Sequence, residues 1–393
     1  MALIYQFGII LVALVVLDTV KSFADLDDDL SPSNRTGRRL GDRLKKPSMN
    51  LNNCETQTGH TGSCMTRFTC MRNGGTVSGF CGTYGVCCET NVQCGKTSKL
   101  KRTLIQTPTT IPTKCTYVFE PYSPNVCQIK IEMEEFRLQQ PQSVTTGANV
   151  GDSVECNDRL EINDITLCGN NDGQHLYVPF DVAGGTDANV NLIFNLPSRD
   201  PISRWRLIVT QLECPSAASR KGLLPFAKNT GFQDLRNIFS SQNNDLPLLA
   251  PRGCSQYFTE RTGTFESFNY NGGAGPYMSN LNYAICFQRQ VGDSAIEFTF
   301  TDFGLPNEGV NNGYDADCHS LIPTTGRSDD YLLIPGAVVT STLGALQPTY
   351  FCGTSSKGTK AIYAAAGPFV IYFNSDEYSS PQDLGFKITF NIA

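Results

Sequence analysis

The sequence carries little charge for its length, and neither sign dominates strongly. Charged residues make up 17% of the chain, whereas about a quarter is usual in globular proteins. Lysine and arginine number 31 against 37 aspartates and glutamates, which leaves a net charge of −6. Binding to a phosphate backbone requires a basic surface. We therefore expect no nucleic-acid partner.

Patterns for metal binding and catalysis are also missing. No two cysteines are spaced as Cys-x-x-Cys and the 3 histidines lie far apart, so a zinc site is not expected. A serine protease requires a histidine beside the nucleophilic serine and an oxyanion hole. Gly292-Asp293-Ser294 has the order found in trypsin-like enzymes, but Ala295-Ile296 follow where glycines would supply the backbone donors. We predict that the protein is not an enzyme.

Only the first residues form a long apolar run. The chain is apolar from Gly8 to Leu17 and then reaches Ser22-Phe23-Ala24, with small residues at the −3 and −1 positions of a cleavage site. This pattern is typical of a secretory signal peptide. The alternative is a membrane anchor, but an apolar core of roughly ten residues is too short to cross about 30 Å of hydrocarbon. We expect residues 1–24 to be removed and the mature protein to be secreted, extracellular and free of the membrane.

Residues 25–53 are acidic first and basic afterwards, with few apolar side chains, which predicts a disordered linker. The basic part contains Arg38-Arg39 and Lys45-Lys46. These pairs are either proprotein cleavage sites or part of a solvated linker. Asn34-Arg35-Thr36 is a glycosylation sequon, so Asn34 is the predicted glycan site.

Cysteine is abundant, with 16 residues, an even number. In a secreted chain these thiols are expected to pair as structural disulfides. Six of the cysteines lie close together in residues 54–93. A segment this short cannot bury enough apolar surface to be stable by itself, so disulfide bridges worth about 2–4 kcal/mol each must supply its stability. The adjacent Cys87 and Cys88 would point in opposite directions along a strand and join it to two different layers. This dense block contains Cys54, Cys64, Cys70, Cys81, Cys87 and Cys88.

Beyond Cys94 the sequence changes to short runs in which apolar and polar residues alternate, separated by turn residues. The clearest runs lie at 127–133, 205–209, 295–300 and 385–390. Such alternation predicts antiparallel strands with one wet face. The segment 216–250 has no cysteine and separates two strand-rich regions. We therefore predict a linker there, between domains at 94–215 and 251–393.

The two strand-rich regions resemble CUB domains, in particular those of secreted arthropod proteins. The run Cys156-Asn157-Asp158-Arg159-Leu160-Glu161-Ile162, followed by Leu167-Cys168-Gly169, is similar to the motif in which a disulfide brackets an acidic strand. In the second region Asp330-Tyr331-Leu332-Leu333-Ile334 and the closing pairs Ser375-Asp376 and Gly385-Phe386 are similar to the same family. The resemblance implies two antiparallel β-sandwiches of jelly-roll type, so that the whole chain is mainly β.

Residues 54–93 are similar to a clip domain, a small disulfide knot that usually precedes serine proteases. The similarity rests on the six cysteines, on the closing Cys87-Cys88 and on the run from Gly74-Gly75 to Phe80-Cys81. Cys127 and Cys214 remain after the two families' patterns are applied, and a bridge between them uses all 16 cysteines. The implied pairs are Cys54–Cys87, Cys64–Cys81, Cys70–Cys88, Cys94–Cys115, Cys156–Cys168, Cys254–Cys286 and Cys318–Cys352, together with Cys127–Cys214.

Some CUB domains hold Ca²⁺ between loop carboxylates, whose oxygen ligands suit this ion. The resemblance implies Asp317, Asp329 and Asp376 as a candidate calcium set in the second region. The family's glutamate ahead of the bracketing cysteine has no clear counterpart, because Glu308 lies ten positions before Cys318. The alternative is that these acids are solvated turn residues. No other cofactor is expected.

These observations predict a secreted, non-enzymatic binding or scaffold protein whose CUB loops meet an extracellular protein or a glycan. Two alternatives stay open. The clip-like block suggests a non-catalytic regulatory cofactor of a clip-type serine protease cascade. A component of a venom or gland secretion has the same sequence features.

Overall fold

The structure is a computed structural model that describes most of the chain beyond its first 52 residues. The described ranges are 53–57, 61–81, 85–145, 152–180, 189–215, 245–305, 313–322, 326–328, 330–341, 344–354, 356–365, 367–377 and 384–393. The predicted signal peptide at 1–24, all but the last residue of the predicted linker at 25–53, with Asn34, and residues 216–244 lie outside them. Within these ranges no helix is long and apolar enough to cross a membrane.

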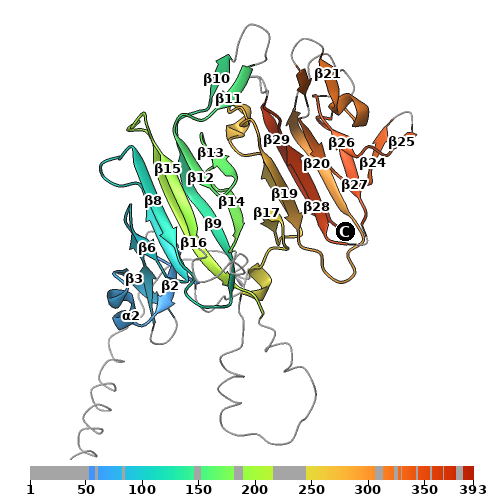
Figure 1. The fold of residues 1–393 in the computed structure, drawn as a ribbon. Coiled ribbons are helices and arrows are strands. Elements are labelled where there is room, and N and C mark those ends of the chain that lie inside the picture. Colours follow the sequence, from blue (N-terminus) through green and yellow to red (C-terminus); the bar gives the residue numbers. More distant parts are fainter. Residues whose placement is uncertain are drawn as a thin grey trace, which may run out of the picture. The chain divides into compact units, whose positions relative to one another are not determined.

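Nearly all of the described secondary structure is β-strand, which confirms the predicted fold class (Figure 1). The alternating runs are strands, since each of them lies within β9 (Val126–Arg137), β16 (Arg204–Glu213), β20 (Ile296–Gly304) or β29 (Gly385–Ile392), apart from one residue before β20. In β9 and β29 buried and partly exposed residues alternate along most of the strand. Successive side chains of a strand point to opposite faces, so this pattern packs one face into a core.

The N-terminal block forms a small antiparallel sheet of order β1-β2-β4-β3 with one short helix. The helix, α2 (Arg67–Arg72), was not predicted; the Thr66 side chain caps it by accepting a hydrogen bond from the backbone N–H of Thr69 at 3.2 Å. Cys87 of β4 is bonded to β1 and Cys88 to the helix. Because β1 belongs to the same sheet as β4, the Cys87 bridge stays within the sheet and only the Cys88 bridge reaches a second layer, so the prediction of two different layers is wrong. The strands are β1 (Asn53–Glu55), β2 (Thr61–Met65), β3 (Thr76–Cys81) and β4 (Gly85–Glu89).

The first sandwich, residues 91–213, has one sheet of order β14-β9-β16-β7-β5 and another of order β13-β12-β15-β8-β6. The sheets pack face to face, since Phe194 of β15 stacks on Trp205 of β16 with 4.3 Å between ring centroids. Edge strands β5 and β6 run parallel to their neighbours. β5 lies before Cys94, so this sheet begins inside the segment predicted as the clip-like block. The remaining bounds are β5 (Asn91–Val92), β6 (Thr97–Ser98), β7 (Arg102–Gln106), β8 (Lys114–Phe119), β12 (Arg159–Ile162), β13 (Ile165–Leu167), β14 (His175–Pro179) and β15 (Val190–Asn195), with a separate hairpin of β10 (Gln142–Thr145) and β11 (Asp152–Glu155).

The second sandwich, residues 254–392, has sheets of order β17-β19-β28-β23-β26 and β18-β29-β20-β27-β24-β25. Its core is aromatic: Phe287 of β19 packs on Phe390 of β29 with 4.7 Å between centroids, and both contact Phe265 of β18. Among the described strands, none pairs with a strand of the first sandwich. The remaining strands are β17 (Cys254–Phe258), β18 (Thr262–Glu266), β19 (Asn282–Phe287), β21 (Ser320–Ile322), β22 (Gly326–Ser328), β23 (Tyr331–Leu333), β24 (Ala337–Ser341), β25 (Gly344–Leu346), β26 (Tyr350–Phe351), β27 (Lys360–Tyr363) and β28 (Phe369–Asn374). Short 3-10 helices are η3 (Leu246–Leu248), η4 (Asn271–Gly273) and η5 (Asp315–Cys318).

The cysteines are joined in disulfides and none is free. No bridge connects the two sandwiches, so each is closed by its own sulfurs. The bonds are Cys54–Cys87, Cys64–Cys81 and Cys70–Cys88 in the block, Cys94–Cys115, Cys127–Cys214 and Cys156–Cys168 in the first sandwich, and Cys254–Cys286 and Cys318–Cys352 in the second.

A polar joint connects the two sandwiches, with β14 and β17 in contact across it (Figure 1). The backbone N–H of Tyr257 donates to Nε2 of His175 at 3.0 Å. Gln128 makes two hydrogen bonds with the backbone of Ala250, at 2.6 and 3.1 Å. A buried polar group is costly unless it is hydrogen-bonded. These bonds therefore fix one relative register of the two surfaces.

Asn269 is the centre of the joint, and its side chain is fully buried. Its Oδ1 accepts from the backbone N–H of Asn170 at 2.8 Å, and its Nδ2 donates to Gln140 Oε1 and to the carbonyl of Pro276. Gly169, at φ +68°, lies so close that a Cβ there would be 2.0 Å from Asn269 Oδ1. The joint thus requires a glycine at that position.

Candidate functional site

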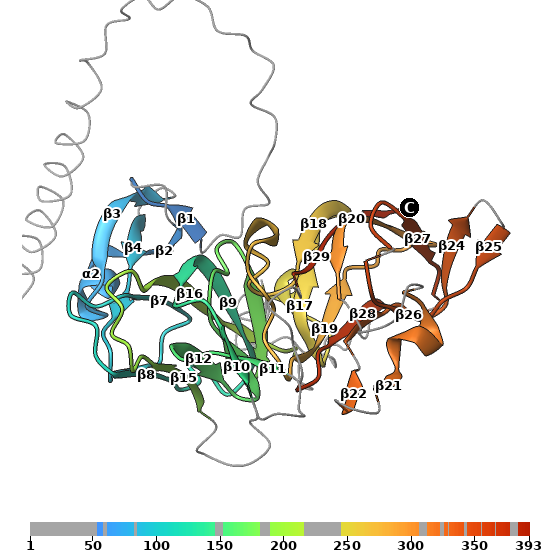
Figure 2. The same cartoon turned by 90° about the horizontal axis from the view of Figure 1, so that it is seen from above.

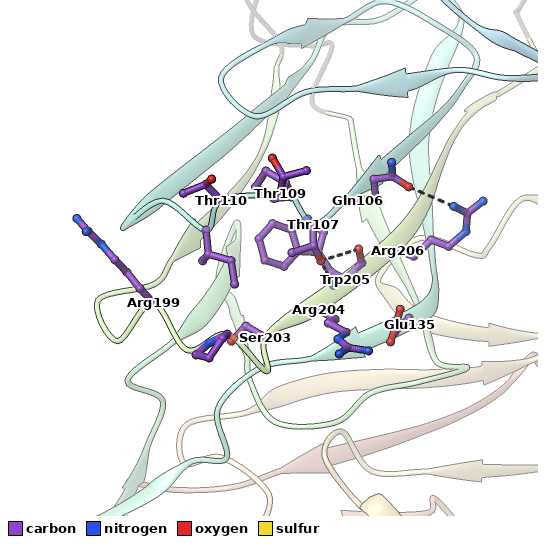
Figure 3. A pocket seen from close by; sticks show the side chains of 13 residues that line it. Gln106, Thr107, Thr109, Thr110, Glu135, Arg199, Ser203, Arg204, Trp205 and Arg206 are labelled. Atoms are coloured by element: carbon purple, nitrogen blue, oxygen red, sulfur yellow. Dashed lines mark hydrogen bonds between the residues drawn. The ribbon is translucent and has the colours of Figure 1, made fainter.

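A pocket of about 830 Å³ opens at one end of the first sandwich (Figure 3). Residues 106–111, after β7, form one wall, and residues of 199–206, which lead into β16, form the other. Glu135 of β9 completes the lining. The strands that end here belong to one sheet, so the pocket lies where their connecting loops meet.

The floor of the pocket is held by Trp205, which is only 1% exposed. Its ring stacks on Phe194, and its Nε1 donates to the Tyr117 hydroxyl at 3.4 Å. Trp205 and Thr107 are joined by two hydrogen bonds: the Thr107 side-chain Oγ1 accepts from the backbone N–H of Trp205 at 2.6 Å, and the backbone N–H of Thr107 donates to the Trp205 carbonyl at 2.9 Å. The two walls are thereby tied together at their base.

The loop that carries Arg199 is fixed by a buried carboxylate. Asp158 is fully buried, and its Oδ1 accepts from the backbone N–H of Ser198 at 3.0 Å while its Oδ2 accepts from the Ser198 hydroxyl. Asp200 caps the next turn, since its Oδ1 accepts from the N–H of Ile202 at 2.9 Å. Asp158, an acid of the CUB-like motif, therefore supports a pocket wall. Arg199 itself lies at φ 51°, a region that non-glycine residues rarely adopt.

The arginines of the pocket differ in their surroundings. Arg206 is neutralised, because Nε bonds Glu134 at 2.8 Å and Nη2 bonds Glu89 at 3.0 Å. Within the described residues, the exposed guanidinium groups of Arg199 and Arg204 have no hydrogen-bond or ion-pair partner. Ser203 is only 2% exposed, and its buried hydroxyl has no hydrogen-bond partner among the described residues. The pocket thus offers cationic donors that the protein does not use itself.

The acids predicted for calcium are distributed over the second sandwich. Asp317 lies on η5 and Asp376 follows β28, while Asp329 lies outside the described residues. The N–H of Asp376 donates to Oδ1 of the buried Asp330 at 2.7 Å, and the Tyr277 hydroxyl donates to its Oδ2 at 2.6 Å. Ca²⁺ takes six to eight oxygen ligands, and the described residues contain no cluster of three or more acids, histidines or cysteines able to hold a metal.

Ser294, Asp293 and His319 each make structural contacts. The Ser294 hydroxyl donates to the carbonyl of Ala393 at 3.5 Å. The backbone N–H of Gln290 and an ion pair with Arg261 hold the pKa of Asp293 below its ordinary value. His319 packs edge-on against Tyr350, with 4.5 Å between ring centroids. Ser294 and Asp293 thus stabilise a turn at the end of the sandwich.

Comparison with known proteins assigns part of the chain. Residues 251–393 match the family model of the animal CUB domain. The matched region contains the whole second sandwich and its two disulfides. No curated protein matches the chain.

Solved structures that match the chain include CUB segments of MASP-1. The match to the CUB1-EGF-CUB2 domains of rat MASP-1 covers 77% of this chain and 99% of the MASP-1 chain, at 14% identity and a TM-score of 0.22. The match to the same segment of human MASP-1/3 covers 75% of this chain and 100% of the MASP-1/3 chain, at 14% identity and a TM-score of 0.23. The match to the MASP-1 CUB2 domain bound to Ca²⁺ covers 35% of this chain and 98% of the CUB2 chain, at 20% identity and a TM-score of 0.19.

Sequence reasoning did not find the pocket. Its residues come from two loops about a hundred positions apart, and neither loop has a recognisable motif. One signal was available: the single tryptophan of the chain stands between two arginines, Arg204 and Arg206, at the start of a predicted strand. The alternating strand pattern accounts for the burial of Trp205 but gives no reason for the exposed Arg204 beside it.

Proposed function

We propose that this protein is a secreted, non-enzymatic binding protein that holds an extracellular partner at the loops of its first sandwich. The observation that carries the proposal is the pocket above Trp205, with the guanidinium groups of Arg199 and Arg204 at its walls. Charged donors without an internal partner are strong contributors to binding once a ligand desolvates them.

Two further features support the proposal. CUB domains are typically non-catalytic modules that mediate protein–protein interaction, and residues 251–393 match that family. The disulfides fit an oxidising, extracellular environment. A sandwich closed by its own bridges keeps its loops in place, which lowers the entropic cost of binding.

The domain boundaries belong to the same proposal. We place a clip-like block at 54–93, a CUB-like domain at 94–215 and a CUB domain at 251–393. β5 and the Glu89–Arg206 ion pair, with 3.0 Å between N and O, tie the end of the block to the first sandwich. Disulfide mapping of the secreted protein by mass spectrometry tests the pairs, and any peptide that links two of the three segments contradicts the boundaries.

Site-specific photocrosslinking tests the binding function. A photoreactive residue is placed at Thr109, on the pocket rim, and as a matched control at Val291, a fully exposed position of the second sandwich. After irradiation in the extracellular fluid of the source tissue, we expect a discrete adduct at Thr109 and none at Val291. The same adducts at both positions, or none at Thr109, would contradict the proposal. A fluorophosphonate probe should label no serine, and labelling would contradict the non-enzymatic assignment.

Non-catalytic regulation of a clip-type serine protease cascade remains the second candidate function, favoured by the three-bridge block. Adding the full-length protein to a purified clip protease and its activator separates the two. A change in the activation rate that disappears when Phe80, exposed on the block, is replaced by Ser supports the regulatory role. An unchanged rate removes it.

Calcium binding by Asp317, Asp329 and Asp376 stays a prediction. A ligand that binds only the folded state raises its stability by about 2.7 kcal/mol at a hundred times its Kd. Thermal melts in CaCl₂ and in EDTA measure this directly. A melting temperature that is higher in calcium, and not in the Asp376→Asn variant, supports the site; identical melts remove it.

A further inference from the structure

The charges of the pocket are arranged asymmetrically. Figure 3 shows Arg199 at one end and Arg204 with Glu135 at the other, while Thr109 and Thr110 lie along the upper edge. Arg199 and the carboxylate of Glu135 therefore lie at opposite ends of the pocket. The exposed threonine hydroxyls between the two ends can donate and accept hydrogen bonds.

The Arg199 end is held in place before any ligand arrives. The buried Asp158 binds Ser198, and the backbone N–H of Arg199 donates to the carbonyl of Leu196 at 3.2 Å. Strained backbone that the surroundings hold in place is typical of ligand-binding positions. The buried hydroxyl of Ser203, which has no partner among the described residues, lies in the same wall. A rotation about its side-chain torsion would let it bond a group that enters the pocket.

We propose that the pocket binds an extended peptide segment of a protein partner and that an acidic side chain of this segment pairs with Arg199. The inference rests on the proposed binding function and names the chemistry of the partner. A guanidinium presents its donors in a planar fork that matches the two oxygens of a carboxylate. The threonine hydroxyls contact the peptide backbone between the two ends of the pocket.

The alternative anionic ligand, a sulfated glycan, is disfavoured by the Glu135 carboxylate and by the net charge of the chain. Glu135 stands in the pocket wall and would repel a polyanion that fills it. The chain as a whole has a net charge of −6, and a polyanion requires an extended basic surface. A peptide with a single acidic side chain can place that charge at Arg199, away from the Glu135 carboxylate.

The chain has its own reporter, because Trp205 is its single tryptophan and lies in the pocket lining. The full-length secreted protein is titrated with capped nonapeptides of alanine and serine that differ at one central position, Glu, Gln or Lys. Tryptophan emission and isothermal titration calorimetry each give a dissociation constant. We expect the Glu peptide to bind at least tenfold more tightly than the Gln peptide and the Lys peptide to bind most weakly. A heparin tetrasaccharide is the polyanionic comparison.

Variants test the assignment to Arg199. We expect Arg199→Gln to weaken binding of the Glu peptide about tenfold and to leave the Gln peptide unchanged. Arg252→Gln, an exposed arginine of the second sandwich, is the matched control and should change neither. Arg199→Glu should reverse the preference, so that the Lys peptide binds more tightly than the Glu peptide. Thermal melts confirm that each variant is folded.

Three results would overturn the inference: equal constants for the Glu and Gln peptides, an equal effect of Arg199→Gln and Arg252→Gln, or tighter binding of heparin than of the Glu peptide. The binding function itself is tested separately by the crosslink at Thr109. If the crosslink forms and the Glu peptide shows no preference, the partner chemistry is wrong and the function stands. If the crosslink also fails, both are wrong.

Discussion

Replacing Gly169 by alanine tests whether the joint between the sandwiches is a specific contact. The new Cβ would lie 2.0 Å from Oδ1 of Asn269. The Asn269 amide cannot move aside freely, because both of its ends are hydrogen-bonded. We therefore expect the substitution to expel this side chain from the joint.

The magnitude follows from two separate costs. An alanine in the left-handed region costs about 1–2 kcal/mol. Expelling Asn269 removes its three side-chain hydrogen bonds, each worth about 1 kcal/mol. Gly169→Ala should therefore lower the free energy of unfolding by about 4–5 kcal/mol. Gly173→Ala is the matched control, because Gly173 has φ +77° and nothing within 4 Å of its would-be Cβ; it should lose about 1–2 kcal/mol.

Urea unfolding of both variants, followed by circular dichroism at pH 7, measures the two values. Adding Asn269→Ala to Gly169→Ala removes the clash, so the double variant should lose less than the sum of the single variants. Equal losses for Gly169→Ala and Gly173→Ala would refute the claim that Asn269 locks the joint. Additive losses in the double variant would refute it as well.

Two further predictions concern pH and the sulfur bridges. Burial, together with the nearby Lys130 ammonium, lowers the pKa of His175 from 6.5 to about 4, so as pH falls through this range the unfolded chain takes up the proton first and stability decreases. Urea unfolding should show a loss of about 2–3 kcal/mol between pH 6.5 and 4 that is absent in His175→Gln; a loss of the same size in the variant would contradict the assignment. Replacing both cysteines of Cys127–Cys214, 87 residues apart, should cost about 2 kcal/mol more than replacing those of Cys156–Cys168, 12 apart, because longer loops lose more entropy on closure. Equal losses in calorimetry would show that loop length does not set the effect.

Much of the fold follows from local patterns that act over a few residues. The alternation in 385–390 predicts β29 because side-chain direction repeats every two residues, whatever lies opposite. Cys87 and Cys88 are adjacent on β4 and bond to different elements, β1 of the same sheet and the helix α2. The helix α2 was missed because six residues are too few to show a helical period, and Thr66, its cap, has no distinctive spacing.

The candidate site depended on contacts between distant segments. Alternation placed Trp205 on a strand but could not bring residues 106–111 against residues 199–206, since loops carry no period that reports what they face. Asp158 shows the same limit: as a carboxylate in a CUB-like motif it could have been a ligand or a turn acid, and the fold uses it to hold Ser198.

The amino-acid order by itself therefore determined the strand-rich class, the sulfur-rich N-terminal block and the absence of a catalytic pattern, because each depends on composition or on short-range periodicity. Only the tertiary structure decided that Asn269 fills the space left by Gly169, and that Arg199 and Arg204 line one pocket with no partner among the residues that the structure describes. Those properties arise from packing between segments far apart in the chain, where the geometry of the fold, and not the neighbouring residues, sets which groups meet.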